Sequence, residues 1–96
     1  MAAKILIVED EAAIQELIIY NLQQAGYETV SAENAEKAMS IINNALPDLI
    51  LLDWMLPGMN GIEFARILRR GERTRLVPII MSVSYTHLTL PTSDLV

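Results

Sequence analysis

Three carboxylate residues follow two short aliphatic runs in the sequence. Glu9 and Asp10 come directly after the run at residues 5–8, and Asp53 comes directly after the run at residues 49–52. If these runs are neighbouring parallel strands, their carboxyl ends meet at one edge of a sheet, and we expect the three side chains to lie within a few ångströms of one another. Like charges at that distance raise one another's pKa unless a cation lies among them, and carboxylate oxygens are hard ligands that select Mg²⁺. The spacing therefore predicts a magnesium site formed by Glu9, Asp10 and Asp53.

A carboxylate beside a bound magnesium ion has what phosphoryl transfer requires. The ion neutralises charge on the oxygens of the transferred group while a carboxylate attacks in line, and the product is an aspartyl phosphate. The aliphatic run that Asp53 ends is expected to be the central strand of the sheet.

Two alternatives to a phosphoacceptor site remain for these residues. Glu9, Asp10 and Glu11 could simply begin a helix, where acidic side chains are favoured by capping and by the dipole, but this leaves Asp53 unexplained. A Mg²⁺-dependent phosphatase could use the same intermediate, but it would need a second acid close to the nucleophile. The residues after Asp53 are Trp54, Met55 and Leu56, which disfavours the phosphatase.

The elements that must position these residues alternate along the chain. Unbroken apolar runs are typical of parallel strands covered on both faces, and they predict strands at residues 5–8, 49–52 and 78–81. Val30 and the β-favouring Thr29 predict a further short strand at residues 27–32. Apolar residues spaced by three and four predict helices at residues 12–25, ended by Gly26, and from Ala35 onward, and Asn60 is placed to cap a third helix at residues 61–70. The fold class is therefore α/β, a doubly wound parallel sheet.

Composition limits the function classes. A chain of 96 residues, 52% of them hydrophobic, fits one small folded domain. Its net charge of −5 argues against nucleic-acid binding by this domain, since phosphate backbones are bound largely by clustered Lys and Arg. The absence of cysteine suits the cytoplasm, and the apolar runs are too short for a signal peptide or a membrane span.

These motifs, in this order and spacing, resemble the receiver domains of bacterial two-component response regulators. The resemblance rests on residues 4–11, residues 47–53, residues 55–58 and Gly61. It implies a flavodoxin-like fold with strand order 2-1-3-4-5. It also implies that Asp53 accepts a phosphoryl group from a sensor histidine kinase. Mg²⁺ would be bound by Asp10, Asp53 and the backbone carbonyl of Met55, with Glu9 acting directly or through water. Such a domain is a phosphoacceptor and not an enzyme in the usual sense.

Within that family the chain is most similar to transcriptional regulators of phosphate-responsive genes. The similarity rests on Trp54 directly after Asp53, on Thr74 and Arg75, and on residues 78–81. It implies a parent protein that binds DNA through a separate domain.

The last part of the sequence departs from the family. The resemblance ends near Met81, whereas a complete receiver continues through a fourth helix, a fifth strand and a fifth helix. Val83 stands where the family has Thr or Ser, and no Lys follows Lys37 to pair with the phosphoryl group. Residues 83–88 instead resemble a translated sequencing adapter. We therefore expect a partial receiver at residues 1–82, with four strands and three helices, and a non-homologous tail at residues 83–96.

This truncation leaves a further alternative, a receiver fragment that does not signal. The surface on which related regulators dimerise, from the fourth to the fifth helix, would be missing. The apolar stripe of the first helix, which includes Ile14, Leu17 and Leu22, would be poorly covered. Each large aliphatic side chain left in water forfeits about 1.5–3 kcal/mol, so we expect marginal stability.

Overall fold

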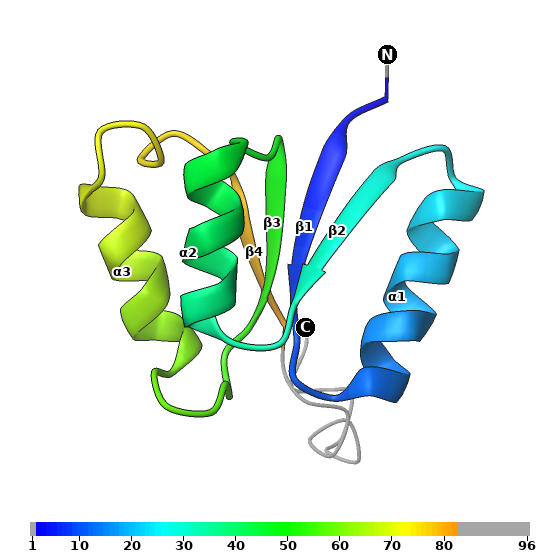
Figure 1. Cartoon of the computed structure of the whole chain (residues 1–96), viewed down its shortest axis with the longest axis horizontal. Helices are drawn as coiled ribbons and strands as arrows, with labels where there is room; N and C mark the ends of the chain where they lie inside the picture. The colour runs from blue at the N-terminus through cyan, green and yellow to red at the C-terminus, as the bar shows by residue number, and fades with distance from the viewer. Residues whose placement is uncertain (1, 83–96) are drawn as a thin grey trace, which may run out of the picture.

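The computed structural model describes residues 2–82 of the chain, with the backbone alone at Ser82. Strands and helices alternate along these residues: β1 (Lys4–Val8), α1 (Ala12–Gln24), β2 (Glu28–Ala32), α2 (Ala35–Asn44), β3 (Leu49–Asp53), α3 (Gly61–Arg70) and β4 (Ile79–Ser82) (Figure 1). The four strands and three helices are those predicted from the hydrophobic pattern, with bounds that differ by about one residue.

The strands form one parallel sheet in the order β2-β1-β3-β4. β1 pairs on one side with β2, where Val8 lies opposite Ala32, and on the other with β3, where Val8 lies opposite Leu52. This order confirms the doubly wound class and the first four places of the expected order 2-1-3-4-5. It also puts the ends of β1 and β3 side by side, which is what the predicted site requires.

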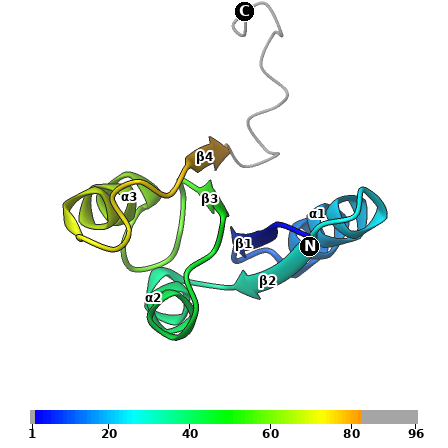
Figure 2. The ribbon, with the colours of Figure 1, turned by 90° about the horizontal axis from the view of Figure 1, so that it is seen from above.

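The helices cover both faces of the sheet. Seen from above, α2 and α3 lie on one side of the strands and α1 lies on the other (Figure 2). Because side chains alternate along a strand, Leu6 and Val8 of β1 belong to the core cluster under α2 and α3, while Ile5 and Ile7 are buried outside that cluster.

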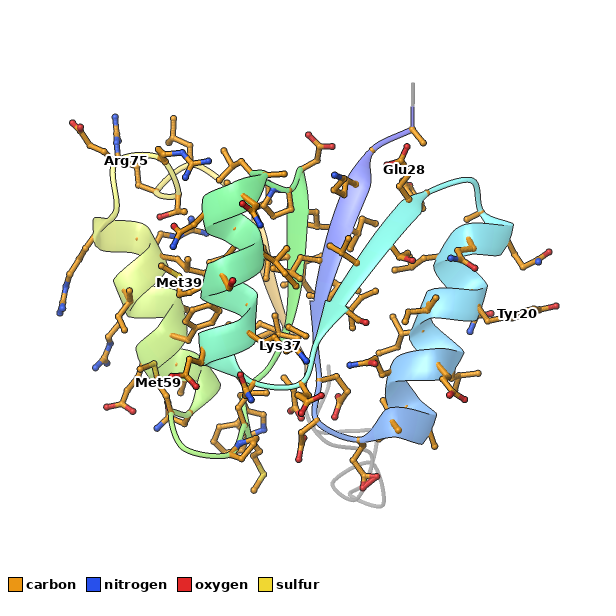
Figure 3. All side chains as sticks on the ribbon, in the orientation of Figure 1. Tyr20, Glu28, Lys37, Met39, Met59 and Arg75 are labelled. Carbon is orange, nitrogen blue, oxygen red and sulfur yellow. The ribbon has the colours of Figure 1, made fainter. Side chains whose placement is uncertain are left out.

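The larger core lies between the sheet and the α2–α3 pair. Strand residues provide one wall and the buried faces of the two helices provide the other, with Phe64 and Leu68 of α3 each 1% exposed. Its members are Leu6, Val8, Ala32, Ala35, Ala38, Ile42, Ile50, Leu52, Leu56, Phe64, Leu68 and Val77. Met39 packs against this cluster from α2 and Met59 from the segment before α3 (Figure 3). The core thus anchors β3 and α3, the elements on either side of the Asp53 loop.

The first helix is much less buried than the other two. None of its residues is fully buried among the described part of the chain, and Leu17 of the predicted apolar stripe is 51% exposed. Tyr20, which is 61% exposed, points away from the sheet (Figure 3). Ile14 and Leu22 of the same stripe are partly buried, and the loss of cover expected from a missing fifth helix stays a prediction.

The ends of two helices follow from their sequence. The side-chain oxygen of Asn60 accepts a hydrogen bond from the Glu63 N–H at 2.9 Å, which confirms the cap predicted for α3. Gly26 after α1 has a φ of 96°, a backbone conformation that costs glycine little, so it ends that helix as predicted.

Some expectations fall outside the described residues. Val83, and with it the whole tail at residues 83–96, lies there, as does any counterpart of the family's later helices and strand. The boundary after residue 82 and the missing dimerisation surface therefore stay predictions. Among residues 2–82, no helix has the length and apolar character needed to cross a bilayer.

The exposed first helix leads to a prediction about stability. We expect the chain to unfold with a midpoint below about 50 °C, toward the lower end of the range for mesophilic domains, because within residues 2–82 one face of the sheet is covered only by a helix that buries little surface. Thermal unfolding followed by far-ultraviolet circular dichroism measures this midpoint. A cooperative transition above that temperature would contradict the prediction.

Candidate functional site

The predicted carboxylates converge at the carboxyl edge of the sheet. Glu9 and Asp10 follow β1 and Asp53 ends β3, and the pairing of these two strands sets the residues side by side. One carboxylate oxygen from each of the three lies within 4.8 Å of the others. The sequence-based expectation that Glu9, Asp10 and Asp53 form one cluster is confirmed.

Burial divides the three carboxylates. Glu9 is 4% exposed and Asp53 is 3% exposed, whereas Asp10 is open to solvent. Charged side chains are rarely buried so deeply without a partner, because removing a carboxylate from water is costly. The cluster therefore consists of two buried carboxylates, those of Glu9 and Asp53, and one solvent-exposed carboxylate, that of Asp10.

This crowding changes the titration of one member. Burial, together with the neighbouring charges of Asp53 and Asp10 and a side-chain hydrogen bond with Asp53, raises the pKa of Glu9 from 4.5 to about 7 against the opposing effect of its bond from the Glu11 N–H. Repulsion among the carboxylates predicted from the sequence that such a pKa would be raised. The structure shows that burial contributes more to the raised pKa of Glu9 than this repulsion does. A divalent cation bound among the three carboxylates would stabilise their charged forms against both burial and mutual repulsion. Carboxylate oxygens are hard ligands that suit such an ion.

Backbone N–H groups hold the two buried carboxylates. Met55 donates its N–H to Asp53 Oδ1 at 3.2 Å, and Glu11 donates its N–H to Glu9 Oε2 at 3.1 Å. The side chain of Met55 is 49% exposed. Met55 thus contacts Asp53 through its N–H, and the metal-binding role expected for its carbonyl stays a prediction.

The acidic residues after β1 do more than begin a helix. Glu11 occupies the N-cap position of α1, but its side chain makes no capping hydrogen bond, and no acidic residue lies in the first turn. Glu9 instead has a carboxylate oxygen within 4.8 Å of those of Asp10 and Asp53. Capping therefore accounts for neither of the carboxylates that meet Asp53.

The loop after Asp53 rests on a glycine whose packing role the sequence did not reveal. Gly61 begins α3 and donates its N–H to the Trp54 carbonyl at 2.8 Å. A Cβ on Gly61 would lie 2.5 Å from the Trp54 Cα and 2.6 Å from the Asp53 carbonyl oxygen. The sequence placed Gly61 at the start of this helix and among the residues that carry the family resemblance, but a sequence pattern does not show how closely two backbones approach.

A shallow groove borders the cluster at Asp10. The groove, of about 450 Å³, is lined by Asp10, Trp54, Met55, Leu56, Pro57 and Asn60. A larger hollow of about 520 Å³ lies between α2 and α3, where Glu36 is the one charged residue in the lining. The titratable cluster is thus at the smaller groove, and the cluster decides which of the two is the candidate site.

Comparison with protein families gives one clear match. The model of the response regulator receiver domain matches residues 5–91. The match extends past residue 82, and the separate tail expected from there on remains a prediction.

Curated relatives include two regulators of the same name. The chain is 58% identical over 77 residues to the phosphate regulon transcriptional regulatory protein PhoB of Pseudomonas aeruginosa, covering 80% of this chain and 34% of that protein. It is 49% identical over 81 residues to PhoB of Escherichia coli, covering 84% of this chain and 35% of that protein. The chain spans about a third of the length of the curated relatives it matches.

Solved structures show the same fold. A putative response regulator from Chloroflexus aurantiacus superposes with a TM-score of 0.83 at 33% identity, covering 84% of this chain and 66% of that one. The chemotaxis response regulator CheY4 of Vibrio cholerae gives a TM-score of 0.81 at 33% identity, covering 84% and 68%. The flavodoxin-like arrangement expected from the sequence is confirmed.

The close approach of Gly61 predicts the effect of adding one methyl group. We expect Gly61→Ala to lower the free energy of unfolding by about 1–3 kcal/mol and to change the fluorescence of Trp54, the one tryptophan of the chain, because the Asp53–Trp54 backbone must shift. Gly26→Ala is the control, since a Cβ there meets nothing within 4 Å. It should cost stability through its positive φ and leave the Trp54 spectrum unchanged; equal spectra for the two variants would refute the packing role.

The raised pKa of Glu9 predicts how stability depends on pH without divalent cations. Between 4.5 and about 7 the folded chain keeps a proton on Glu9 that the unfolded chain releases, so the free energy of unfolding should fall as the pH rises through this window. Urea unfolding at a series of pH values in a chelator measures the fall. Glu9→Gln should flatten it, whereas Glu16→Gln on the exposed side of α1 should not. The same slope in both variants would contradict the assignment.

Proposed function

The chain belongs to the response regulator receiver domain family, and we propose that Asp53 accepts a phosphoryl group from the phosphohistidine of a sensor histidine kinase. Mg²⁺ would be held by Glu9, Asp10, Asp53 and the backbone carbonyl of Met55. The observation that carries the proposal is the convergence of three carboxylates, two of them nearly inaccessible to solvent, at the carboxyl edge of the sheet.

The proposed step is a transfer from nitrogen to oxygen. An Asp53 oxygen attacks phosphorus, the P–N bond to the imidazole breaks, and its electron pair stays on the imidazole nitrogen. The product is a mixed anhydride on Asp53. The bound cation would neutralise charge on the oxygens of the transferred group. The domain changes its own nucleophile in this step, which is why we regard it as a phosphoacceptor and not an enzyme.

The protein residues have separate tasks in this step. The Met55 N–H orients the Asp53 carboxylate through Oδ1 at 3.2 Å. Asp10, the exposed carboxylate, is the one that an entering cation would meet first. Glu9 would give up its proton as the cation binds, because a ligand carboxylate must be ionised, and its pKa of about 7 makes that release occur near neutral pH.

For the parent protein we propose a DNA-binding transcriptional regulator of phosphate-responsive genes, located in the cytoplasm. The support is the 58% and 49% identity to two PhoB proteins, of which this chain covers about a third. The domain itself would not contact nucleic acid, since the whole chain carries a net charge of −5.

The two remaining alternatives differ in weight. The phosphatase is disfavoured, because family membership points to a phosphoacceptor and Trp54, Met55 and Leu56 bring no second acid next to Asp53. The hypothesis of a non-signalling fragment rests on Val83, where the family has Thr or Ser, and on the absence of any Lys after Lys37. Val83 lies outside the described part of the chain. A direct test of phosphorylation decides between the receiver and that fragment.

Incubation of the chain with Mg²⁺ and acetyl phosphate, a small phosphodonor, is that test. We expect intact-mass spectrometry to show one added phosphoryl group, and Asp53→Ala or removal of Mg²⁺ to abolish it, because the nucleophile or the charge-neutralising ion is then missing. Asp48→Asn is a matched control, since Asp48 directly precedes β3 at the opposite end and accepts from the Lys4 N–H. Label retained by Asp53→Ala would refute the assignment, and no label on the unaltered chain would favour the non-signalling fragment.

A further inference from the structure

One side chain ties the turn that carries Glu9 and Asp10 to helix α1. Gln15 lies in the first turns of α1, and its Nε2 donates to the Glu9 carbonyl oxygen at 2.8 Å and to the Ala32 carbonyl oxygen at 3.4 Å. Because both partners are carbonyl oxygens, the amide nitrogen must be the atom that faces them. Gln15 therefore joins α1 to the ends of two adjacent strands, β1 and β2.

The bond to Glu9 controls a specific peptide plane. The Glu9 carbonyl belongs to the peptide that links Glu9 to Asp10, and a peptide unit is planar, so holding this oxygen fixes the direction in which the chain continues from one carboxylate to the next. The other polar atoms of Glu9 have their own partners: its N–H donates to the Ala32 carbonyl at 2.9 Å, and its Oε2 accepts from the Glu11 N–H. Within residues 2–82, Gln15 is the one side chain that donates to the Glu9 carbonyl.

Packing gives the turn little other support from α1. The N-cap residue Glu11 makes no side-chain capping bond, and the helix buries no residue fully in the described part of the chain. The opposite loop of the site is held differently, by the close backbone contact of Gly61 with Trp54 and by the core around Phe64. Besides the bonds that Glu9 makes to Ala32 and Glu11, the Gln15 amide is the described side chain of α1 that holds the Glu9–Asp10 turn.

We infer that Gln15 is a positioning residue for the cation site: it holds the Glu9–Asp10 peptide so that both carboxylates converge on Asp53. The inference rests on the proposed function, because it concerns how that same site binds Mg²⁺. It assigns Gln15 no contact with the ion or with the phosphoryl group.

Calorimetric titration of the full chain with Mg²⁺ tests this role. We expect Gln15→Met, which keeps the length of the side chain and removes the donor, to weaken Mg²⁺ binding about five- to tenfold, the effect of losing roughly one hydrogen bond. Gln23→Met is the matched control. Gln23 lies on the same helix and donates to Thr29 Oγ1 at 3.2 Å, at the end of α1 away from the cluster. Its substitution should change Mg²⁺ affinity by less than about twofold, since no contact to the turn is lost.

Gln15→Glu separates positioning from charge. This variant has the same shape but adds a carboxylate beside the site, so electrostatic attraction alone would tighten Mg²⁺ binding. Loss of the donated hydrogen bond predicts weaker binding. Weaker binding in both Gln15 variants supports the inference, and tighter binding in Gln15→Glu overturns it.

Parallel thermal unfolding keeps the result distinct from simple destabilisation. Titrations are made at a temperature where circular dichroism shows each variant to be folded. If Gln15→Met does not fold, Gln15→Glu is used as the test variant in its place. A lowered midpoint with unchanged Mg²⁺ affinity would mean a purely structural role and would overturn the inference. Mg²⁺ binding that Gln15→Met weakens, in a chain that acetyl phosphate does not label at Asp53, would overturn the proposed phosphoacceptor while supporting the positioning role.

Discussion

Repulsion among three carboxylates, two of them withdrawn from water, is the constraint to which the structure around the site responds. The pairing of β1 with β3 creates it by setting Val8 opposite Leu52, which carries Glu9 and Asp53 to the same edge of the sheet. A sheet register shifted by one residue would turn one of these side chains to the other face. The cluster is therefore a direct product of the strand register, and the burial that raises the pKa of Glu9 comes from the same layered core that stabilises the fold.

Uncharged backbone N–H groups hold the two buried carboxylates in place despite this repulsion. The backbone N–H groups of Glu11 and Met55, which lie two residues beyond each carboxylate, donate to the side-chain oxygens of Glu9 and Asp53. Neither bond neutralises a charge; each fixes an oxygen in place. An arrangement of fixed, like-charged oxygens with no cationic side chain among the described hydrogen bonds suits a divalent ion that binds reversibly, because the protein has not already satisfied the charge itself.

Local patterns predicted the fold and the identity of the cluster, since each depends on information within a short stretch. Unbroken apolar runs marked three of the strands, Asn60 marked the start of α3, and an acid at the end of each inner strand marked the site. The contacts that hold the site could not be read in the same way. The tight fit of Gly61 and the reach of Gln15 to the Glu9 carbonyl depend on distances between segments, and nothing in either residue's neighbours along the chain specifies them.

The shallow packing of α1 gives this helix a role that differs from that of α2 and α3. A helix without fully buried residues in the described chain can open at a low free-energy cost while the core under α2 and α3 stays intact. Its first turn nevertheless begins shortly after Glu9 and is bonded to it through Gln15. A ligand that needs an ordered Glu9–Asp10 turn must therefore bind better to the closed helix than to the opened one. If Gln15 positions the site as inferred, thermodynamic linkage would couple the closing of α1 to the binding of a cation at the acidic cluster, and α1, the least buried helix within residues 2–82, would report the state of the site.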